Sequence, residues 1–323
     1  MEEPVTQQLL AEAPKTQHLL ELFVEDCRDR QLTEETIRRY RSSIKQYLAF
    51  LKQRGITLFQ VDRHVLHEYI HERRQEGITQ KTLENDLSGI AALYGYFVFE
   101  DHMEKNPVPE VRKRYLRRYK QEKDVDEESP RKLLTVEQMS LLINSIIDTR
   151  DKAIMTLLAK TGVRRGELIA MDVIDIDWVE QSITLKRRRF KKRSGRTVFF
   201  DDETARVLKR WLSQRRRLGP QTPALFIGEH GERLKRNGIY SLVAKHAERV
   251  GLHDSSSPRP EDHLSAHCFR HWFTTHLRRA GMDREFIKAL RGDRRREAID
   301  IYDRIDRNEL RRAYLAFIPQ LGL

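Results

Sequence analysis

The chain has 323 residues, of which 61 are Lys or Arg and 49 are Asp or Glu, giving a formal net charge of +12. This length suits about two domains, and the charge makes a polyanion, nucleic acid above all, the expected partner. Cys27 and Cys268 are its two cysteines and lie far apart, so neither a disulfide framework nor a zinc knuckle is indicated. Because the N-terminus is acidic and no apolar run approaches the roughly 18 residues of a membrane span, we expect a cytoplasmic protein that binds no membrane.

Residues 16–111 show a helical pattern throughout, with apolar residues at spacings of three and four. Thr33 and Thr79 each precede such a stretch, where a threonine side chain can cap the first backbone N–H groups. No alternating pattern typical of a strand occurs here. The sequence therefore predicts an all-α first domain that Asn106-Pro107 closes, preceded by an N-terminal tail over residues 1–15.

Residues 112–131 are almost wholly charged and have the composition of an interdomain linker. Thr135 then opens a helix in the second domain, residues 132–323. Two short β-rich runs, Ser182–Leu185 and Thr197–Phe200, flank a basic stretch and predict an antiparallel hairpin with a basic tip. The rest of this domain reads as helix, so we expect it to be mainly α with a small antiparallel sheet.

Two motifs in the second domain could meet an anion. Arg164 and Glu167 follow Gly162 at the start of a helix, although glycine followed by charge is also how many helices join. His267 and Arg270 stand three residues apart on a helix and so share one face. Arginine offers a planar charged fork for phosphate oxygens, and histidine can move a proton near neutral pH. The alternative is an ordinary surface pair.

Tyr302 lies near the C-terminus, nine residues after Asp293. It falls within a helical stripe formed with Ala298, Ile299 and Ile305, so a core position is its alternative role. Whether Tyr302 is a core residue or a functional one is decided by the order of the motifs along the chain.

Taken in order, the motif at 161–168, the basic hairpin, His267–His271, Gly292-Asp293 and Tyr302 resemble the tyrosine recombinase (phage integrase) family. The resemblance covers nearly the whole chain, and residues 16–111 resemble the core-binding, SAM-like domain of that family. It implies a site-specific recombinase that cleaves and rejoins double-stranded DNA through a 3′-phosphotyrosine. Such an enzyme uses no cofactor or metal and integrates or excises a mobile element or viral genome. The Arg291-Gly292-Asp293 box also looks like archaeal integrases.

The resemblance assigns roles to single residues. Arg164 and Arg270 would grip the non-bridging oxygens of the scissile phosphate, and Tyr302 would be the nucleophile. His267 would carry the proton of the nucleophile, while Glu167 would orient Arg164 or His267.

The family also places a lysine on the hairpin as general acid. We favour Lys191, which lies five residues before Arg196, over its neighbour Lys192; that both merely contact phosphates is the alternative. The other basic hairpin residues are expected to bind DNA: Arg187, Arg188, Arg189, Lys192, Arg193 and Arg196.

Asp293 departs from the family, which more often has histidine or tryptophan at this position. An ionised aspartate only accepts hydrogen bonds. We therefore expect Asp293 to brace His267 or one of the arginines rather than to donate to the phosphate.

His67–His71 matches the His-Glu-x-x-His string of zinc proteases. Tyr69 and Ile70 belong to an apolar stripe and no third ligand follows, so we expect no metal site.

The resemblance further implies a homotetramer on DNA, with an accessory directionality factor as a further partner. The apolar segment Glu309–Leu323 could dock on a neighbouring protomer or on its own domain. A DNA-binding protein without catalysis and a monomeric DNA-relaxing enzyme are the alternative functions.

Overall fold

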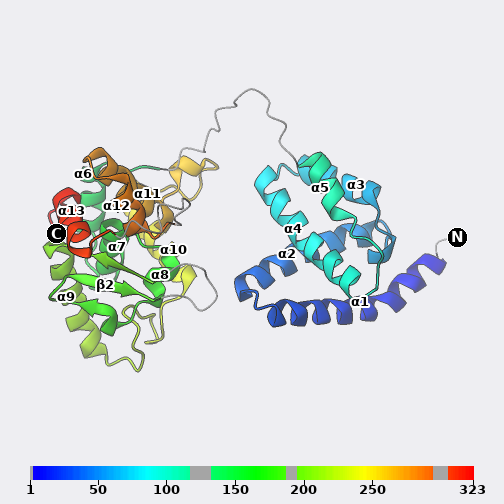
Figure 1. Ribbon diagram of the computed structural model, residues 1–323, viewed down its shortest axis with the longest axis horizontal. Coiled ribbons are helices and arrows are strands. Elements are labelled where there is room, and N and C mark those ends of the chain that lie inside the picture. Colours follow the sequence, from blue (N-terminus) through cyan, green and yellow to red (C-terminus); the bar gives the residue numbers. More distant parts are fainter. Residues whose placement is uncertain (1–2, 117–131, 187–194, 294–304) are drawn as a thin grey trace. The chain divides into compact units, whose positions relative to one another are not determined.

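The computed structural model describes residues 3–116, 132–186, 195–293 and 305–323 (Figure 1). The chain divides into two compact units, Met1–Asp124 and Val125–Leu323, and each has a hydrophobic core of its own. The division falls within residues 112–131, the segment predicted as a linker. Among the described residues no helix is long and apolar enough to cross a membrane.

The first unit is all-α, as its periodicity predicts. Its helices are α1 (Glu3–Asp29), α2 (Glu34–Gln53), α3 (Arg63–Gln75), α4 (Gln80–Phe99) and α5 (Val108–Tyr115), with a 3-10 turn over Leu58–Gln60. Helices α2 and α4 pack at close range, because a Cβ added to Gly89 would lie 3.2 Å from the Cβ of Ser43. Beside this contact the hydroxyl of Ser43 donates to the buried carboxylate of Asp86 over 3.0 Å.

Helix caps explain where several helices begin. The side chains of Thr33, Thr79 and Thr135 each accept a hydrogen bond from the backbone N–H three residues later, at 3.2 Å in all three cases. Each cap satisfies one of the N–H groups that a helix start leaves without an intrahelical partner. The helix starts predicted at these threonines are confirmed.

The helices of the first unit extend beyond the limits that the sequence suggested. Helix α1 begins at Glu3, inside the predicted tail, and α5 follows Asn106-Pro107, where the bundle was expected to close. Val108 and Val111 of α5 are buried against α3 and α4. The last turn of α5 therefore occupies the first residues of the predicted linker.

The second unit is mainly α with a small sheet, and the predicted fold class is confirmed. Its helices are α6 (Val136–Asn144), α7 (Thr149–Thr161), α8 (Arg165–Ala170), α9 (Asp202–Leu218), α10 (Arg236–Arg249), α11 (Ala266–Arg279), α12 (Arg284–Arg291) and α13 (Arg307–Phe317), with 3-10 turns over Val173–Asp175 and Pro260–Asp262. Helix α7 is the centre of the core and packs against α9 and α11.

The sheet is antiparallel, with strand order β1-β2-β3. Strand β2 (Ser182–Leu185) has the predicted limits, β3 (Arg196–Phe199) begins one residue earlier than predicted, and the two-residue β1 (Ile176–Asp177) was not predicted. In the register, Leu185 pairs with Arg196. This pairing places Arg196 at the end of β3 that is nearest the hairpin tip.

The C-terminal segment packs on its own domain. Lys160 of α7 is fully buried, and its ammonium contacts the Asp201 and Glu203 carboxylates, each at 2.6 Å, and the carbonyl of Pro319 at 2.7 Å. Glu203 in turn accepts hydrogen bonds from the backbone N–H groups of residues 321, 322 and 323. Of the two docking modes weighed for Glu309–Leu323, this chain shows the intramolecular one.

Candidate active site

A glycine turn leads the chain from the core into the site. Helix α7 ends at Gly162, which is left-handed with φ 57°, and a Cβ there would lie 2.5 Å from Cδ1 of Phe273. Only glycine fits this position without strain or overlap. The turn brings Arg164 to the N-cap position of α8.

Glu167 fixes two arginines. Its carboxylate accepts a bidentate pair of hydrogen bonds from Arg196, at 2.8 and 3.0 Å, and bonds from the backbone N–H and the guanidinium of Arg164, at 2.7 and 3.2 Å. Burial raises the pKa of this carboxyl, but the hydrogen bonds and charge of Arg196, followed by those of Arg164, outweigh burial and lower the pKa to about 2. Glu167 is thus ionised at neutral pH and orients Arg164, one of the two predicted options.

Arg270 is buried, with 4% of its surface exposed. Its guanidinium donates to the carbonyl of Gly162 and to the carbonyl of Arg291, both at 2.8 Å, and to the carboxylate of Asp293 at 3.1 Å. Burial lowers the pKa of Arg270 to about 9, helped by the positive charges of Arg164 and Arg291, while Asp293 opposes the shift. The group therefore remains a cation at neutral pH.

Asp293 lies among three guanidiniums. Its carboxylate is 3.1 Å from Arg270, 3.4 Å from Arg164 and 3.1 Å from Arg291. The structure thus places it against the arginines, the second of the two bracing roles predicted for it. The guanidiniums of Arg164 and Arg270 therefore share one acceptor, the carboxylate of Asp293, which keeps them close to each other.

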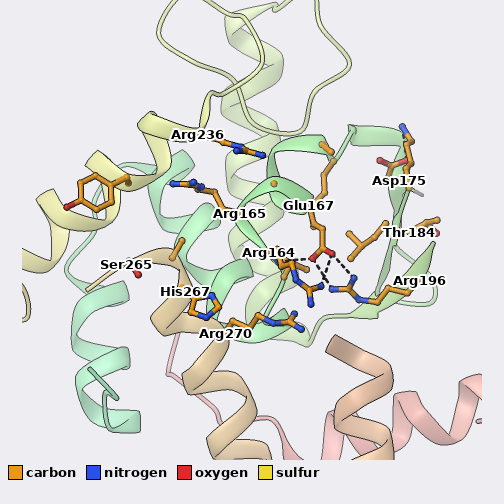
Figure 2. A pocket seen from close by; sticks show the side chains of 18 residues that line it. Arg164, Arg165, Glu167, Asp175, Thr184, Arg196, Arg236, Ser265, His267 and Arg270 are labelled. Carbon is orange, nitrogen blue, oxygen red and sulfur yellow. Dashed lines mark hydrogen bonds and ion pairs between the residues drawn. The ribbon is translucent and has the colours of Figure 1, made fainter. Parts of the chain in front are cut away.

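The two arginines and His267 border one cavity of about 470 Å³. His267 is exposed on the first turn of α11, and its ring meets that of His271 edge-on at 4.9 Å. Figure 2 shows Arg164, Arg270 and His267 around the same hollow. The charged side chains of the lining are Arg164, Arg165, Lys186, Arg196, Arg236 and Arg270 against Glu167 and Asp175. Such an excess of positive charge suits a phosphate.

Comparison with known families agrees with this geometry. Residues 132–309 match the sequence model of the phage integrase family, and residues 20–101 match that of the phage integrase N-terminal SAM-like domain. The chain belongs to the phage integrase family.

Curated relatives of this integrase-family chain are tyrosine recombinases. XerC of Actinobacillus pleuropneumoniae serotype 7 (strain AP76) is 27% identical over 298 residues, which cover 90% of each chain. XerD of Staphylococcus epidermidis (strain ATCC 12228 / FDA PCI 1200) is 24% identical over 300 residues, covering 90% of this chain and 95% of the relative.

Solved structures share the fold. The XerH site-specific recombinase, in a post-cleavage complex with a palindromic difH substrate, has a TM-score of 0.63 at 18% identity over 90% of this chain and 78% of that one. The Tn1549 transposon integrase, in complex with a circular intermediate DNA, has a TM-score of 0.61 at 18% identity over 91% of this chain and 97% of that one.

Part of the predicted integrase site lies outside the described residues. This holds for Tyr302, for both lysines considered as general acid, Lys191 and Lys192, and for four of the hairpin arginines, namely Arg187, Arg188, Arg189 and Arg193.

Arg196, expected to bind DNA, is described and lines the cavity beside Glu167. It is largely buried, holds Glu167, and donates through Nε to the carbonyl of Leu290 at 2.9 Å. A Cβ on Gly292 would lie 2.7 Å from Cδ of Arg196, so glycine is needed for this close approach. Arg196 therefore positions Glu167, a role that the sequence did not reveal because the two residues are 29 positions apart.

Sequence reasoning also missed other residues that line the cavity. Arg165 follows Arg164 directly, so its proximity to the site could have been anticipated. Arg236, on α10, and Lys186, at the end of β2, carry no local signal. Lys186 is paired with Asp172 and Asp175 at 2.5 and 3.2 Å.

The His-Glu-x-x-His string of the first unit has ordinary partners. The ring of His67 stacks on that of Tyr115 at 4.3 Å, and His71 hydrogen-bonds Gln75 at 2.9 Å. Within the described part of the chain no group of three or more His, Cys, Asp or Glu side chains could hold a metal ion.

Proposed function

We propose that this protein is a site-specific DNA recombinase that cleaves and rejoins double-stranded DNA through a 3′-phosphotyrosine on Tyr302. The observation that carries this proposal is the convergence of Arg164, Arg270 and His267 on one basic cavity, in a chain of the phage integrase family. The reaction would integrate or excise a mobile element or a viral genome.

In the proposed reaction, the hydroxyl oxygen of Tyr302 attacks the scissile phosphorus while the bond from phosphorus to the 5′-oxygen breaks. The proton of the tyrosine passes to His267, and the departing 5′-oxygen takes a proton from Lys191. The 5′-hydroxyl of another strand then attacks the phosphotyrosine and releases Tyr302. Because each step exchanges one phosphodiester for another, the bond energy is conserved and no ATP is needed.

Arg164 and Arg270 would stabilise the negative charge that builds on the non-bridging oxygens. Their orientation is set before substrate binds, by Glu167, Asp293 and the carbonyls of Gly162 and Arg291. Preorganised donors of this kind cost no reorganisation during the reaction, and removal of one typically costs about 3 to 4 kcal/mol of transition-state stabilisation.

The finer assignments belong to this proposal as well. The enzyme would act as a homotetramer on paired DNA sites through its C-terminal segment, with an accessory factor setting direction. The Arg291-Gly292-Asp293 box supports an integrase of archaeal type, and the absence of a span-length apolar helix among the described residues is consistent with action in the cytoplasm.

A nicked suicide duplex carrying the recombination site tests the proposal. In the presence of EDTA, wild type should form a denaturant-resistant adduct with DNA and Tyr302→Phe should form none. Asp293→Ala should bind the duplex but form adduct at least about tenfold more slowly, because Arg164 and Arg270 lose the acceptor they share. The control Glu248→Ala removes a carboxylate on the surface of α10 and should match wild type.

Each other outcome has a definite meaning. Tight, salt-sensitive binding without adduct would overturn catalysis in favour of a DNA-binding protein. Adduct on any duplex, with relaxation of plasmids of arbitrary sequence, would instead identify a relaxing enzyme. If Asp293→Ala forms adduct as fast as wild type, Asp293 does not brace the arginines, but the proposed recombinase activity still stands.

A further inference from the structure

We propose that His253, in the loop between α10 and α11, is a positioning residue that holds the start of α11 and thereby sets the place of His267 in the cavity. This inference rests on the proposed function, because it takes His267 as the group that receives the proton of Tyr302. The proposed reaction itself gives His253 no role.

His253 is buried and joins the two ends of its loop. The loop covers residues 250–265, and 6% of the surface of His253 is exposed. Its Nδ1 accepts a hydrogen bond from the backbone N–H of Leu264 over 2.9 Å. Next to this contact, the N–H of Asp254 donates to the carbonyl of Asp262 over 3.0 Å. These two bonds close the loop just before α11 begins.

The acceptor nitrogen is what a histidine contributes at this position. Because Nδ1 accepts, the ring is neutral and carries its proton on Nε2, and Nε2 is buried with no hydrogen-bond partner among the described residues. A buried donor without an acceptor costs stability, so an apolar side chain would be buried here at a lower cost. What His253 provides, and a leucine would not, is the acceptor for the N–H of Leu264.

Helix α11 depends on this contact because its N-cap residue does not cap it. Ser265 stands at the N-cap, but its side chain bonds no N–H of the helix and instead contacts Sγ of Cys268 at 3.6 Å. The first turn of a helix leaves N–H groups without an intrahelical partner, and a missing cap weakens that turn. The start of α11 is therefore held by the preceding residue, Leu264, through its buried side chain and its bond to His253.

His267 is the site residue that the start of α11 positions. It is the second residue of the helix, is exposed, and borders the cavity together with Ser265 (Figure 2). Arg270 lies one turn further on, where it is buried and donates to the carbonyls of Gly162 and Arg291. A loosened start would therefore displace His267 and leave Arg270 in place. A displacement of about 1 Å can slow a catalysed step by about a hundredfold.

Three substitutions separate the acceptor from the rest of the ring. His253→Asn places an amide oxygen as many bonds from Cβ as Nδ1, whereas His253→Gln carries its oxygen one bond further and His253→Leu has none. With saturating nicked suicide duplex, His253→Leu and His253→Gln should form adduct about tenfold more slowly than wild type. His253→Asn should stay within about threefold of wild type, and all three should bind the duplex with wild-type affinity.

A double-mutant cycle shows whether the effect passes through His267. In a His267→Ala background, His253→Leu should slow adduct formation by less than about twofold, because the residue it positions is gone. Val207→Ala truncates a buried residue of α9 that does not line the cavity, so it controls for a general loss of stability and should form adduct at the wild-type rate. Hydrogen exchange of the Leu264 amide should be faster in His253→Leu than in wild type or His253→Asn.

The inference is overturned if His253→Leu has the same effect in both backgrounds, if His253→Gln matches wild type, or if His253→Asn is as slow as His253→Gln. The comparison of His253→Asn with His253→Gln decides if His253→Leu does not fold or His267→Ala forms no measurable adduct. Failure of the proposed function has a different signature, because wild type itself would then form no adduct while exchange of the Leu264 amide still responded to His253→Leu.

Discussion

Glu167 shows how a single carboxylate can prepare a cationic site. It is the partner of both Arg164 and Arg196, and the second of these pairs is bidentate. Two guanidiniums close together repel each other, and a shared carboxylate offsets the repulsion and fixes their directions. Arg164 is therefore oriented before any DNA phosphate arrives.

The pH dependence of stability should reveal this carboxylate. Its pKa falls from 4.5 in the unfolded chain to about 2 in the folded one, so its contribution is complete above about pH 4.5 and is lost as pH falls toward 2. Glu167→Gln should be less stable by about 1.5 to 3 kcal/mol at pH 7 and should lose less stability than wild type between pH 4.5 and 2. Urea unfolding at a series of pH values measures both effects.

Glu229→Gln, which alters an exposed carboxylate in a loop, is the matched control and should keep the wild-type profile. Parallel pH profiles for wild type and Glu167→Gln would show that Glu167 does not provide the stabilisation argued here.

At the scale of elements, helix starts were predicted correctly where the deciding contact lies within a few residues along the chain. The threonine caps at residues 33, 79 and 135 act on N–H groups three positions away, and all were found from sequence. Helix α5 was missed because its polar residues resemble a linker, whereas Val108 and Val111 become core only through contact with α3 and α4.

In the candidate site, too, contacts between residues close in sequence were predicted from local patterns, and contacts between distant elements were not. His267 and Arg270 share a helix face, so their pairing was visible. The contacts of Arg196 with Glu167 and of Asp293 with Arg164 join elements distant in the chain. Nothing local in the sequence indicates the contact of Arg196 with Glu167, and a contact of Asp293 with an arginine was expected only from the family resemblance and from the acceptor chemistry of aspartate.

The glycine that ends α7 offers a test of how elements position the site. Gly162→Ala and Gly219→Ala both put a Cβ on a left-handed residue at a helix end, at a cost of about 1 to 2 kcal/mol. Only at residue 162 does the Cβ meet a neighbour, Phe273, while that of residue 219 meets open space. Overlap should therefore make Gly162→Ala less stable than Gly219→Ala by about another 1 to 3 kcal/mol, measured by urea unfolding.

Gly162→Ala should also slow adduct formation, since the carbonyl of Gly162 holds Arg270. Equal stabilities for the two variants would mean that Phe273 yields to the added methyl group and that the close approach is not required.

At the scale of the whole molecule, the C-terminal segment joins distant parts of the second unit. Glu203 and Lys160 bind it through backbone groups of residues 319–323, and Leu321 is buried. Because Glu203 and Lys160 contact main-chain atoms, the same segment from a second protomer could make the same bonds. The structure shows them made within one chain.

A double-mutant cycle tests the strength of this attachment. Ending the chain after Ile318 deprives Glu203 of three N–H donors and Lys160 of a carbonyl, so unfolding free energy should fall by at least about 3 kcal/mol. In a Glu203→Gln background, which has already lost the charged acceptor, the same truncation should cost at least about 1 kcal/mol less. Additive losses would show that the segment is held by burial of Leu321 and not by the carboxylate. A peptide of residues 307–323 that restores stability to the truncated chain would show that the attachment works between molecules, as assembly through exchanged C-terminal segments requires.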